Sequence, residues 1–344
     1  MDYEGKLNLL EDERYWLLHF HFLAHRGYHL RPRFDPNHVP LRSLGNKRKC
    51  CHSDDYEDEI WNERASIVDA VRTDGTRCVL RRTRTWSDEI PVLQHIAGCG
   101  HDERNHVVPI LDIVLLPTDD DEALIVMPLL RLFFDPPFVR VSEVLEAVRQ
   151  YLECMQFLHE NLVAHRDFCA LNLMMDSSQL IPGGFHFAST CQPPDASSFG
   201  LRYSDRTQVA PMRYFLTDFG LAIKLPARGS LVTGVFGQDR TVPELSWEVP
   251  YDPFKVDIYQ FGRVIFRELI DAYDHLECLR PLGEAMTRAS PDSRPDADGA
   301  LKIFEGLVQS MSDADLKRRL VINSDRYLTY APRVRWCYNP YCAC

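Results

Sequence analysis

Two short stretches of the chain carry residue types that could perform chemistry. The first is His165-Arg166-Asp167 with Asn172 five positions after Asp167, and the second is Asp218-Phe219-Gly220. A carboxylate can accept a proton from a hydroxyl group, and carboxylate and amide oxygens can bind a hard cation. Each triplet alone is a weak signal, because three such residues often meet by chance or in a turn. Their order, with an apolar run before each, makes them specific.

Composition bounds the class of protein. The chain has 344 residues, which is enough for one large two-lobed domain or two ordinary ones, and 45% of them are hydrophobic, as in a globular protein. A net charge of −11 argues against binding to nucleic acid or an anionic membrane, which needs a basic surface. We find no signal peptide and no run of about 18 apolar residues, so we expect an intracellular protein, in the cytoplasm or nucleus.

The cysteines suggest reduced thiols. Their number is odd, at 11, and no pair of C-x-x-C hooks forms a zinc site. Cys342 and Cys344 form a terminal C-x-C, a form that is sometimes lipidated, but they do not make a C-a-a-X box. We therefore expect no stable association with a membrane.

The first 60 residues are expected to form an N-terminal extension. The apolar stretch from Glu11 to His25 stops before Gly27, which predicts a helix with a C-cap. This helix is expected to pack on the body of the protein, and binding to a partner is the alternative. The prolines and charge runs from Arg31 to Glu59 predict an irregular, solvated wrap or linker.

Strands dominate the next part of the chain. Residues Ser66 to Arg82 alternate around Asp74-Gly75, which is a strong hairpin signal. Two more strands are predicted at Val107 to Leu116 and at Ala123 to Met127, joined by an acidic turn.

Helices are predicted further along. Ser142 is placed to cap a helix that extends to Glu160, with an apolar face. That face consists of Leu145, Val148, Leu152 and Met155. A second helix, which opens in the segment from Tyr251 to Gly262, is apolar on most of its circumference and is therefore expected to be buried in a large lobe.

These motifs, taken together, resemble the protein kinase family. The resemblance runs from about Ser66 to Val308, and the local sequence around the motifs is most similar to that of kinase-like proteins abundant in basidiomycete fungi. The matches, in order, are Glu89, His165 to Asp167, Asn172, Asp218 to Gly220, Pro243-Glu244, Asp257 and Arg294.

The resemblance implies an α+β, two-lobed protein-kinase-like fold. A small, mainly β N-lobe would occupy about 61–127, within a domain at 61–312. A hinge at 128–130 would connect it to a larger helical C-lobe at 131–312, followed by a C-terminal tail at 313–344.

The resemblance also implies ATP and Mg²⁺ as cofactors. Asp167 would orient the substrate hydroxyl or accept its proton, and Asn172 and Asp218 would hold the magnesium ions. Arg166 would receive a regulatory phosphate. Ser230, Thr233 and Thr241 are the candidate hydroxyls for that phosphate, and nothing in the sequence selects one of them.

A second set of residues would bind the nucleotide. Arg81 stands at the position of the phosphate-contacting lysine and is expected to pair with Glu89; the alternative is that Arg81, Arg82 and Arg84 are exposed strand-end charges. The adenine side would consist of Val79, Met127 as gatekeeper, the carbonyl group of Pro128 and the backbone of Leu130.

The remaining matched residues are expected to have structural roles. His165, Phe219 and Gly220 belong to the two motifs, and Asp257 would tie its helix to the backbone of the catalytic loop. Arg294 and Glu244 are predicted to form a buried ion pair.

Three differences from the protein kinase pattern are expected to weaken nucleotide binding. Arg81 is a planar fork in place of a compact ammonium group, and Cys169 replaces a lysine that would contact the γ-phosphate. No glycine occurs from Asn46 to Asp74, so the glycine-rich loop is missing. A Pro-, Gly- and Ser-rich insert, 179–208, predicts a surface loop that is either passive or regulates access to the cleft.

The leading hypothesis is therefore a protein kinase that transfers the γ-phosphoryl group of ATP to a protein serine or threonine. The alternative is a catalytically weak or dead pseudokinase that acts as a binding or scaffold module. A kinase of small molecules is disfavoured, because Arg166 and the pairing of Glu244 with Arg294 belong to the protein-kinase branch. A protein substrate or partner is expected in either case.

Overall fold

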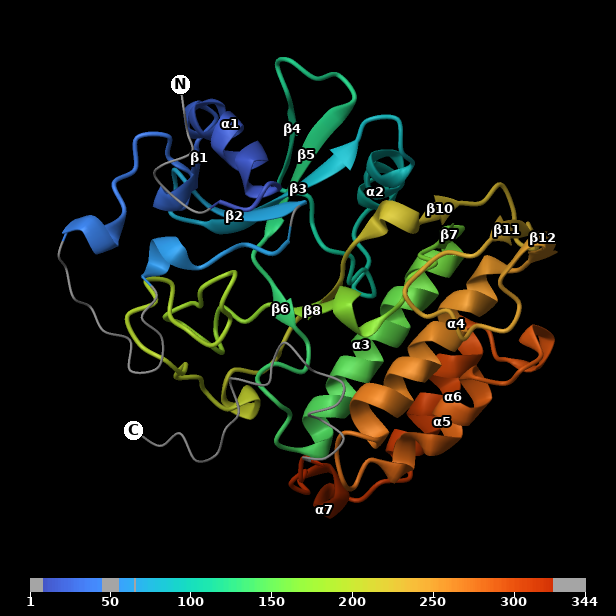
Figure 1. Cartoon of the computed structure of the whole chain (residues 1–344). Coiled ribbons are helices and arrows are strands. Elements are labelled where there is room, and N and C mark those ends of the chain that lie inside the picture. The colour runs from blue at the N-terminus through green and yellow to red at the C-terminus, as the bar shows by residue number, and fades with distance from the viewer. Residues whose placement is uncertain (1–8, 45–55, 65, 324–344) are drawn as a thin grey trace.

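The structure is a computed structural model, and it describes residues 9–44, 56–64 and 66–323. It is a mixed α/β protein in which a curled sheet lies at one end and a group of helices at the other (Figure 1). This arrangement is compatible with the expected two-lobed fold. Residues 45–55 and the terminal Cys342 and Cys344, with the expectations attached to them, lie outside the described residues.

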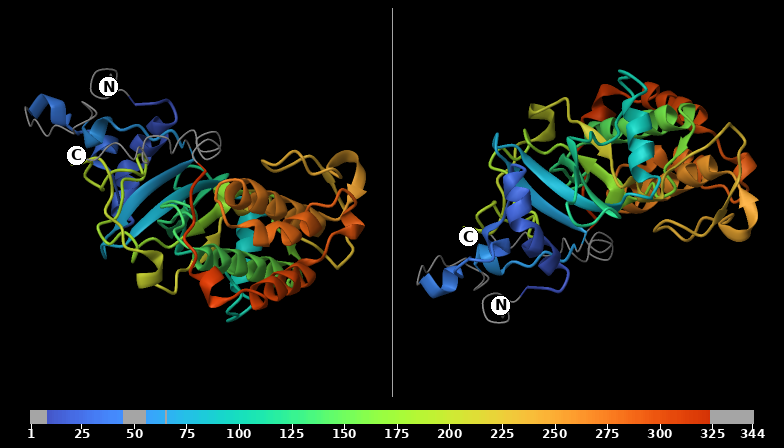
Figure 2. Two further views of the ribbon diagram at one scale, coloured as in Figure 1. Left: turned by 90° about the horizontal axis from the view of Figure 1, so that it is seen from below. Right: turned by 90° about the horizontal axis from the view of Figure 1, so that it is seen from above.

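The N-terminal helix packs on the sheet as predicted. Helix α1 (Glu13–His25) begins two residues later than expected and buries Trp16 and Leu23 completely, in a cluster with the first sheet strands. Gly27 follows it with φ +86°, and a Cβ atom there would lie 2.8 Å from Thr73 Oγ1. The sharp turn after α1 therefore requires glycine. Figure 2 shows this helix lying against the strands.

Five antiparallel strands form the sheet. Their order is β1-β2-β3-β5-β4, with β1 at Tyr28–Leu30, β2 at Ile67–Arg72, β3 at Arg77–Arg84, β4 at Asp112–Leu115 and β5 at Glu122–Pro128. The predicted hairpin is confirmed, because β2 and β3 are joined by the turn at Asp74-Gly75. Strand β1 lies within the expected extension, so that segment is continuous with the sheet.

The strand expected from Val107 to Leu116 is shorter than predicted. Pro109 has no backbone N–H to contribute to a ladder, and regular pairing begins only at Asp112. Val107 instead makes an isolated bridge to Leu216. Helix α2 (Glu89–Ala97) precedes this segment, and its buried residues join the main core.

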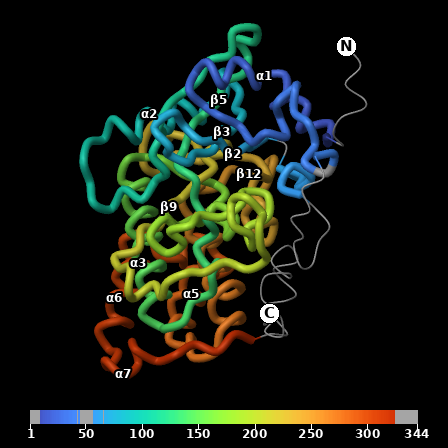
Figure 3. The backbone as a smooth tube through the Cα atoms, turned by 90° about the vertical axis from the view of Figure 1, so that its left-hand side faces the viewer, coloured from blue at the N-terminus to red at the C-terminus, as the bar shows by residue number. Residues whose placement is uncertain are grey.

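The helical part is built around α3 (Val141–Glu160) and α4 (Pro253–Val264), which continues as a π-helix at Ile265–Ile270. Helices α5 (Arg280–Met286), α6 (Ala297–Gln309) and α7 (Asp313–Leu316) complete it, with α7 at the end of the molecule opposite α1 (Figure 3). The predicted apolar face of α3 is buried.

The predicted cap of α3 is wrong. The helix begins at Val141, and Ser142 lies in its first turn, while the N-cap residue Arg140 makes no side-chain cap. The free amides near this end have other acceptors: Val141 N–H donates to Arg318 O at 3.1 Å, and Val139 N–H donates to Glu143 at 2.8 Å. Contacts with a distant segment therefore replace the local serine cap.

Short strands carry the connecting loops. Strands β6 (Arg131–Leu132), β8 (Leu173–Met175) and β9 (Tyr214–Leu216) form one small sheet. Strand β7 (Val163–Ala164) pairs with β10 (Ile223–Lys224), and β11 (Val232–Gly234) pairs with β12 (Ser246–Tyr251). The two chemical motifs follow β7 and β9.

The insert is more deeply packed than a surface loop. Its buried side chains are Leu180, Ile181, Phe185, His186, Phe187, Gln192, Ala196 and Arg206. A polar, glycine-rich composition predicted solvation, but the few large residues between the glycines and prolines provide anchors.

The cysteines also differ in part from expectation. Five described cysteines are free thiols, namely Cys78, Cys99, Cys154, Cys169 and Cys278. Cys191, in the insert, is disulfide-bonded, so the expectation of reduced thiols is wrong at this position. Within the described ranges, every helix is too short or too polar to cross a membrane.

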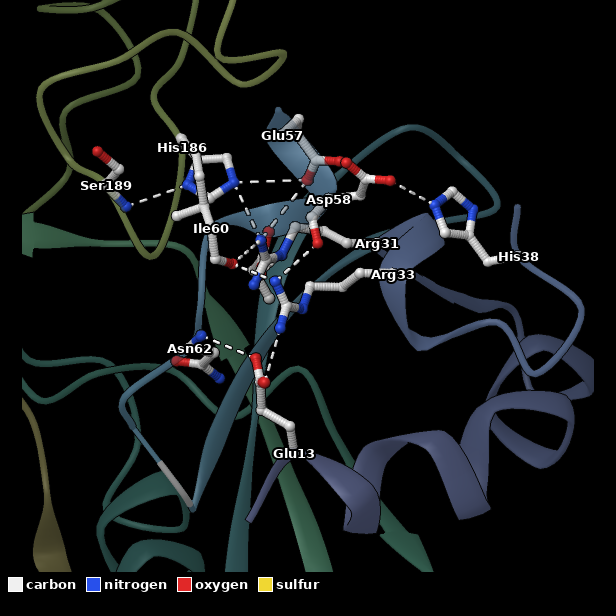
Figure 4. A network of polar contacts seen from close by, with 11 residues as sticks. Glu13, Arg31, Arg33, His38, Glu57, Asp58, Ile60, Asn62, His186 and Ser189 are labelled. Carbon is white, nitrogen blue, oxygen red and sulfur yellow. Dashed lines mark hydrogen bonds and ion pairs between the residues drawn. The ribbon is translucent and has the colours of Figure 1, made fainter. Parts of the chain in front are cut away.

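A buried ion pair ties the N-terminal helix α1 to the segment that follows β1 (Figure 4). Arg33 Nη2 donates to Glu13 at 2.7 Å, and both side chains are 1% exposed. Arg33 Nη1 also donates to the carbonyl groups of Asp58 at 2.9 Å and Ile60 at 2.7 Å. Burial lowers the pKa of Arg33. The polar wrap expected from composition is therefore organised around one buried guanidinium group.

Removing that guanidinium group should destabilise the fold. Arg33→Met is expected to lower the free energy of unfolding by about 3–5 kcal/mol, because the Glu13 carboxylate stays buried without its cation. Urea unfolding followed by circular dichroism measures this. Arg14→Ala, at an exposed position beside Glu13, is the control. The double variant Arg33→Met with Glu13→Gln should recover part of the lost free energy of unfolding, because it leaves no unpaired buried charge. Equal unfolding midpoints for Arg33→Met and Arg14→Ala would contradict the expectation.

Candidate active site

A buried carboxylate on α4 holds the H-R-D loop. Asp257 is fully buried and accepts from His165 N–H at 2.9 Å and from Arg166 N–H at 2.7 Å, as predicted. His159 of α3 lies 3.0 Å from the same carboxylate. Because two backbone amides and a third polar group converge on one anion, the loop is fixed to both helices.

Gln260 provides a second tie that the motif comparison missed. Its Oε1 accepts from Phe168 N–H at 2.8 Å, and its Nε2 donates to Arg166 O at 3.1 Å. The Gln260 side chain is 1% exposed, and most of its buried neighbours on α4 are apolar. The sequence does hold a signal for this tie, because an amide side chain in a helix predicted to be buried needs hydrogen-bond partners.

Asp167 is surrounded by amide donors. Asn172 Nδ2 donates to its backbone oxygen at 2.9 Å and to Oδ2 at 3.1 Å. Gln238 contributes its backbone N–H to Oδ1 at 2.7 Å and its Nε2 to Oδ2 at 3.3 Å. The preceding residue, Gly237, has φ +85°, and a Cβ atom there would lie 2.7 Å from Arg166 O. Only glycine allows the segment to approach Asp167 this closely.

The two expected metal ligands lie at the ends of neighbouring strands. Leu173 of β8 pairs with Leu216 of β9, and Thr217 N–H donates to Asn172 O at 2.9 Å. Asp218 follows with φ +62°, and its carboxylate accepts from Gly220 N–H at 3.3 Å. The pairing thus brings together two residues that are 46 positions apart in the chain.

The donor set fits Mg²⁺. Asn172 turns its Nδ2 group to Asp167, which leaves Oδ1 as an acceptor, and the Asp218 side chain is 44% exposed. Magnesium prefers oxygen ligands and commonly keeps water and phosphate oxygens beside one or two protein groups. In the part of the chain that the structure describes, no cluster of three or more His, Cys, Asp or Glu side chains could hold a metal alone.

His165 and Phe219 connect the two motifs. His165 Nε2 lies 3.0 Å from Thr217 O, and the Phe219 ring meets the His165 ring edge-on, with 4.8 Å between their centroids. Both side chains are buried. The structural positions expected of them agree with this packing, which makes the two loops one unit.

Arg81 joins the sheet to the second motif. Its Nη1 pairs with Glu89 of α2, and its Nη2 donates to Asp218 Oδ1 at 2.6 Å. Glu89 also accepts from Thr83 at 2.6 Å. The predicted pair is therefore present, and the reading of Arg81 as an exposed strand-end charge is wrong. Arg82 contacts Glu122 at 2.8 Å, so it is engaged elsewhere.

The residues expected on the adenine side lie where β3 meets β5. Val79 pairs with Met127 in register, and Pro128 ends the strand, opposite Cys78. Met127 is buried, while Leu130 directly precedes β6 and packs on the main core. The roles of Val79, Met127, Pro128 and Leu130 in binding nucleotide stay predictions.

A charged pair shares this face of the sheet. Asp69 of β2 is opposite Val79 in the register, so both side chains point to one side. Arg31, directly after β1, places its Nε 3.2 Å from Asp69 Oδ1. The row that includes Val79 and Met127 is thus polar at its β1 end, where a nucleobase would need apolar cover.

Cys169 does not replace the missing lysine. Burial, followed by the charge of Asp167, raises the pKa of the thiol to about 12. The side chain is therefore neutral at physiological pH and supplies no positive charge to a phosphate group.

The segment from Asp218 to Glu244 engages Arg166 in another way. The guanidinium carbon of Arg166 lies 4.4 Å from the centre of the Phe236 ring, and Phe236 in turn packs on Trp247. The hydroxyl group of Thr241 donates to Asp239 at 2.6 Å. A phosphate on Ser230, Thr233 or Thr241 as the partner of Arg166 stays a prediction.

The predicted pair at the end of this segment is present. Arg294 makes a two-pronged contact with Glu244, at 2.5 and 2.8 Å, and its side chain is fully buried. The contact fixes the end of the segment to the helical part.

Comparison with known proteins gives limited support. No protein-family model matches the chain. The chain is 26% identical over 136 residues to a light-sensor protein kinase of Ceratodon purpureus. The match covers 39% of the chain and 10% of the length of that protein. This partial similarity is kinase-related, and the more specific resemblance to basidiomycete proteins stays a prediction.

The anchor at Asp257 can be tested by stability. Asp257→Asn is expected to cost about 2–3 kcal/mol, because an amide NH₂ group must then face one of two backbone N–H donors. Asp274→Asn on the surface is the matched control. Urea unfolding curves that coincide for the two variants would show that the carboxylate is not needed.

Burial of Cys169 predicts slow alkylation. With a pKa of about 12, only roughly one thiol in ten thousand is ionised at pH 8. Iodoacetamide should therefore label Cys169 much more slowly than the partly exposed Cys99, as mass spectrometry of peptides can measure. Because the folded-state pKa is raised, the thiol's contribution to stability should fall as pH rises above about 8.5. Labelling of both at one rate would contradict this.

Proposed function

We propose that the chain has the two-lobed fold of a protein kinase and transfers the γ-phosphoryl group of ATP to a serine or threonine of a protein. One arrangement carries the proposal: Asp257 anchors the loop with Asp167 and Asn172, and Arg81 of strand β3 reaches Asp218 of the second motif. The smaller lobe would be 61–127 with β1 added, the hinge 128–130 and the larger lobe 131–312.

The residues around Asp167 define its part in the reaction. Its carboxylate would orient the substrate hydroxyl and accept its proton, while Asn172 and Gln238 hold the carboxylate in place. Gln238 uses both oxygens of that carboxylate, so this residue has to move or share its acceptor when a hydroxyl approaches. Arg166 belongs to the same loop, and its guanidinium group would bind a phosphate on the segment from Asp218 to Glu244.

The nucleotide would lie between the sheet and the second motif. Asn172 and Asp218 would hold Mg²⁺, which, when bound, neutralises charge on the β- and γ-phosphate oxygens. Arg81, positioned by Glu89, would offer its donors to the phosphates in exchange for its contact with Asp218. Val79 and Met127 would cover the base, with the backbone at Pro128 and Leu130 as its hydrogen-bonding edge.

The partial similarity to a protein named a light-sensor protein kinase supports the class of reaction. The acidic net charge of −11 favours a protein as substrate or partner over nucleic acid. A cytoplasmic or nuclear location and a relationship to basidiomycete kinase-like proteins are further parts of the proposal.

A pseudokinase that acts as a scaffold is the second candidate. The charged pair of Arg31 and Asp69 favours it, because the pair occupies the row of Val79 and Met127. Neutral Cys169 also leaves one phosphate charge uncompensated. In such a scaffold, the loop anchored by Asp257 would have a structural role and no catalytic one.

Radiolabel transfer from ATP to a generic protein substrate tests the catalytic proposal. Asp167→Asn is expected to lower the rate by about 10²–10⁴-fold, because the base is lost. The exposed Asp274→Asn should leave the rate unchanged. Equal incorporation by the wild type and Asp167→Asn would overturn the assignment of Asp167.

Nucleotide binding separates the two candidates. The melting temperature of the wild type should rise with millimolar ATP and magnesium and return when the metal is chelated, because a ligand that binds only the folded state stabilises it. Absence of any shift favours the scaffold.

A further inference from the structure

The insert, residues 179–208, leaves the helical part after β8 and returns at β9. Its central stretch has three consecutive buried residues, Phe185, His186 and Phe187, although prolines and glycines flank it. The structure therefore gives this loop a fixed position.

On the helical side of the hinge, the insert is held by Arg131. This residue directly follows the hinge in β6, and its Nη1 donates to Thr190 O at 2.8 Å. The guanidinium carbon also lies 4.8 Å from the centre of the Phe185 ring. Asp135 pairs with Arg131 at 2.8 Å and fixes its direction.

On the sheet side, the same stretch contacts β3 and the segment after β1. Arg77 Nη1 donates to Phe185 O at 3.2 Å. His186 Nε2 lies 3.0 Å from Arg31 Nη1 and 3.4 Å from Glu57 Oε1. The His186 side chain is 1% exposed, and its Nδ1 accepts from Ser189 N–H at 3.0 Å (Figure 4). One short stretch is thus bound to both sides of residues 128–130.

These contacts lie at the hinge end of the proposed nucleotide face. Beside these contacts, a cavity of about 600 Å³ lies between the insert and the sheet, and Asp69, Arg77 and Leu129 are in its wall. Asp69 is in register with Val79, so the cavity borders the row expected to cover the base. His186 lies 3.0 Å from Arg31, and Arg31 in turn pairs with Asp69.

We propose that the insert is a clamp across the hinge that restricts entry of nucleotide. The clamp consists of residues 185–190 of the insert, held by Arg131 on one side and by Arg77, Arg31 and Glu57 on the other. It restrains movement of the sheet against the helical part and keeps Arg31 on Asp69, beside Val79. Its release opens the face and lets Arg31 move away from Asp69. This regulation rests on the proposed function of the same cleft.

The physical argument is one of burial and charge. His186 is inaccessible to water, so each broken contact leaves a polar group unpaired in the interior. Arg31 lies between two anions, Asp69 on the sheet and Glu57 beside the insert. Because His186 Nδ1 accepts from Ser189 N–H, its Nε2–H faces Glu57, so His186 and Arg31 share that carboxylate. Binding of a base on the row of Val79 needs Arg31 to move.

Two variants loosen the clamp from different contacts. His186→Ala removes the contact with Arg31 and Glu57, and Arg77→Ala, which is milder, removes the bond to Phe185 O. Hydrogen exchange measured by mass spectrometry should show amides of residues 180–200 exchanging roughly tenfold faster in each variant, because a buried polar contact is lost. Ser198→Ala, an exposed change in the same insert, is the control and should leave exchange unaltered. Unchanged exchange in both folded variants overturns the clamp.

The second measurement tests regulation of the cleft. Thermal stability is followed with ADP and magnesium, and the nucleotide-induced shift should be larger in His186→Ala and Arg77→Ala than in the wild type and Ser198→Ala. Faster exchange with an equal, non-zero shift in all four proteins overturns the regulatory role and keeps nucleotide binding. Absence of a shift in all four proteins overturns the regulatory role together with the proposed nucleotide site, while the exchange data still decide whether the clamp exists.

Discussion

The geometry of the candidate site depends on the buried carboxylate of Asp257. A carboxylate without water is costly unless donors surround it, and here two loop amides and His159 fill that role. Within the loop, Arg166 has a positive φ of 66°, which is unfavourable for a residue other than glycine. Asp257 stabilises that conformation, and the position of Asp167 follows from it.

The sheet is connected to this anchored loop through one arginine. Arg81 lies between Glu89 and Asp218, so strand β3, helix α2 and the second motif share a single guanidinium group. A forked cation can satisfy both carboxylates at once, which a lysine ammonium group does with less directional control. The same engagement means that a phosphate would compete with two carboxylates for Arg81. The groups proposed to hold metal and to act as the base are thus assembled, whereas the group proposed to bind phosphate is already paired with two carboxylates.

Several features of fold and site could be predicted because they are local or belong to a spaced motif. The hairpin at Asp74-Gly75 follows from turn chemistry, and the pairs Arg81–Glu89 and Arg294–Glu244 follow from the resemblance. Other features could not. Ser142 looked like a cap, but Glu143 and a distant carbonyl group take the donors near that end. Gln238 carries no motif, and only its approach to Asp167 marks it as important.

The sequence by itself determined which chemical groups are present and in which order: a carboxylate, an amide, a second carboxylate, and an apolar helix with an aspartate. It could do so because side-chain chemistry and short-range periodicity are written in neighbouring residues. Only the tertiary structure decided that Tyr28–Leu30 joins the sheet, that Arg31 lies beside Asp69, and that the insert contacts the chain on both sides of residues 128–130. Those contacts join segments up to 155 positions apart, and their partners are selected by burial and charge in the folded chain, which no local pattern encodes.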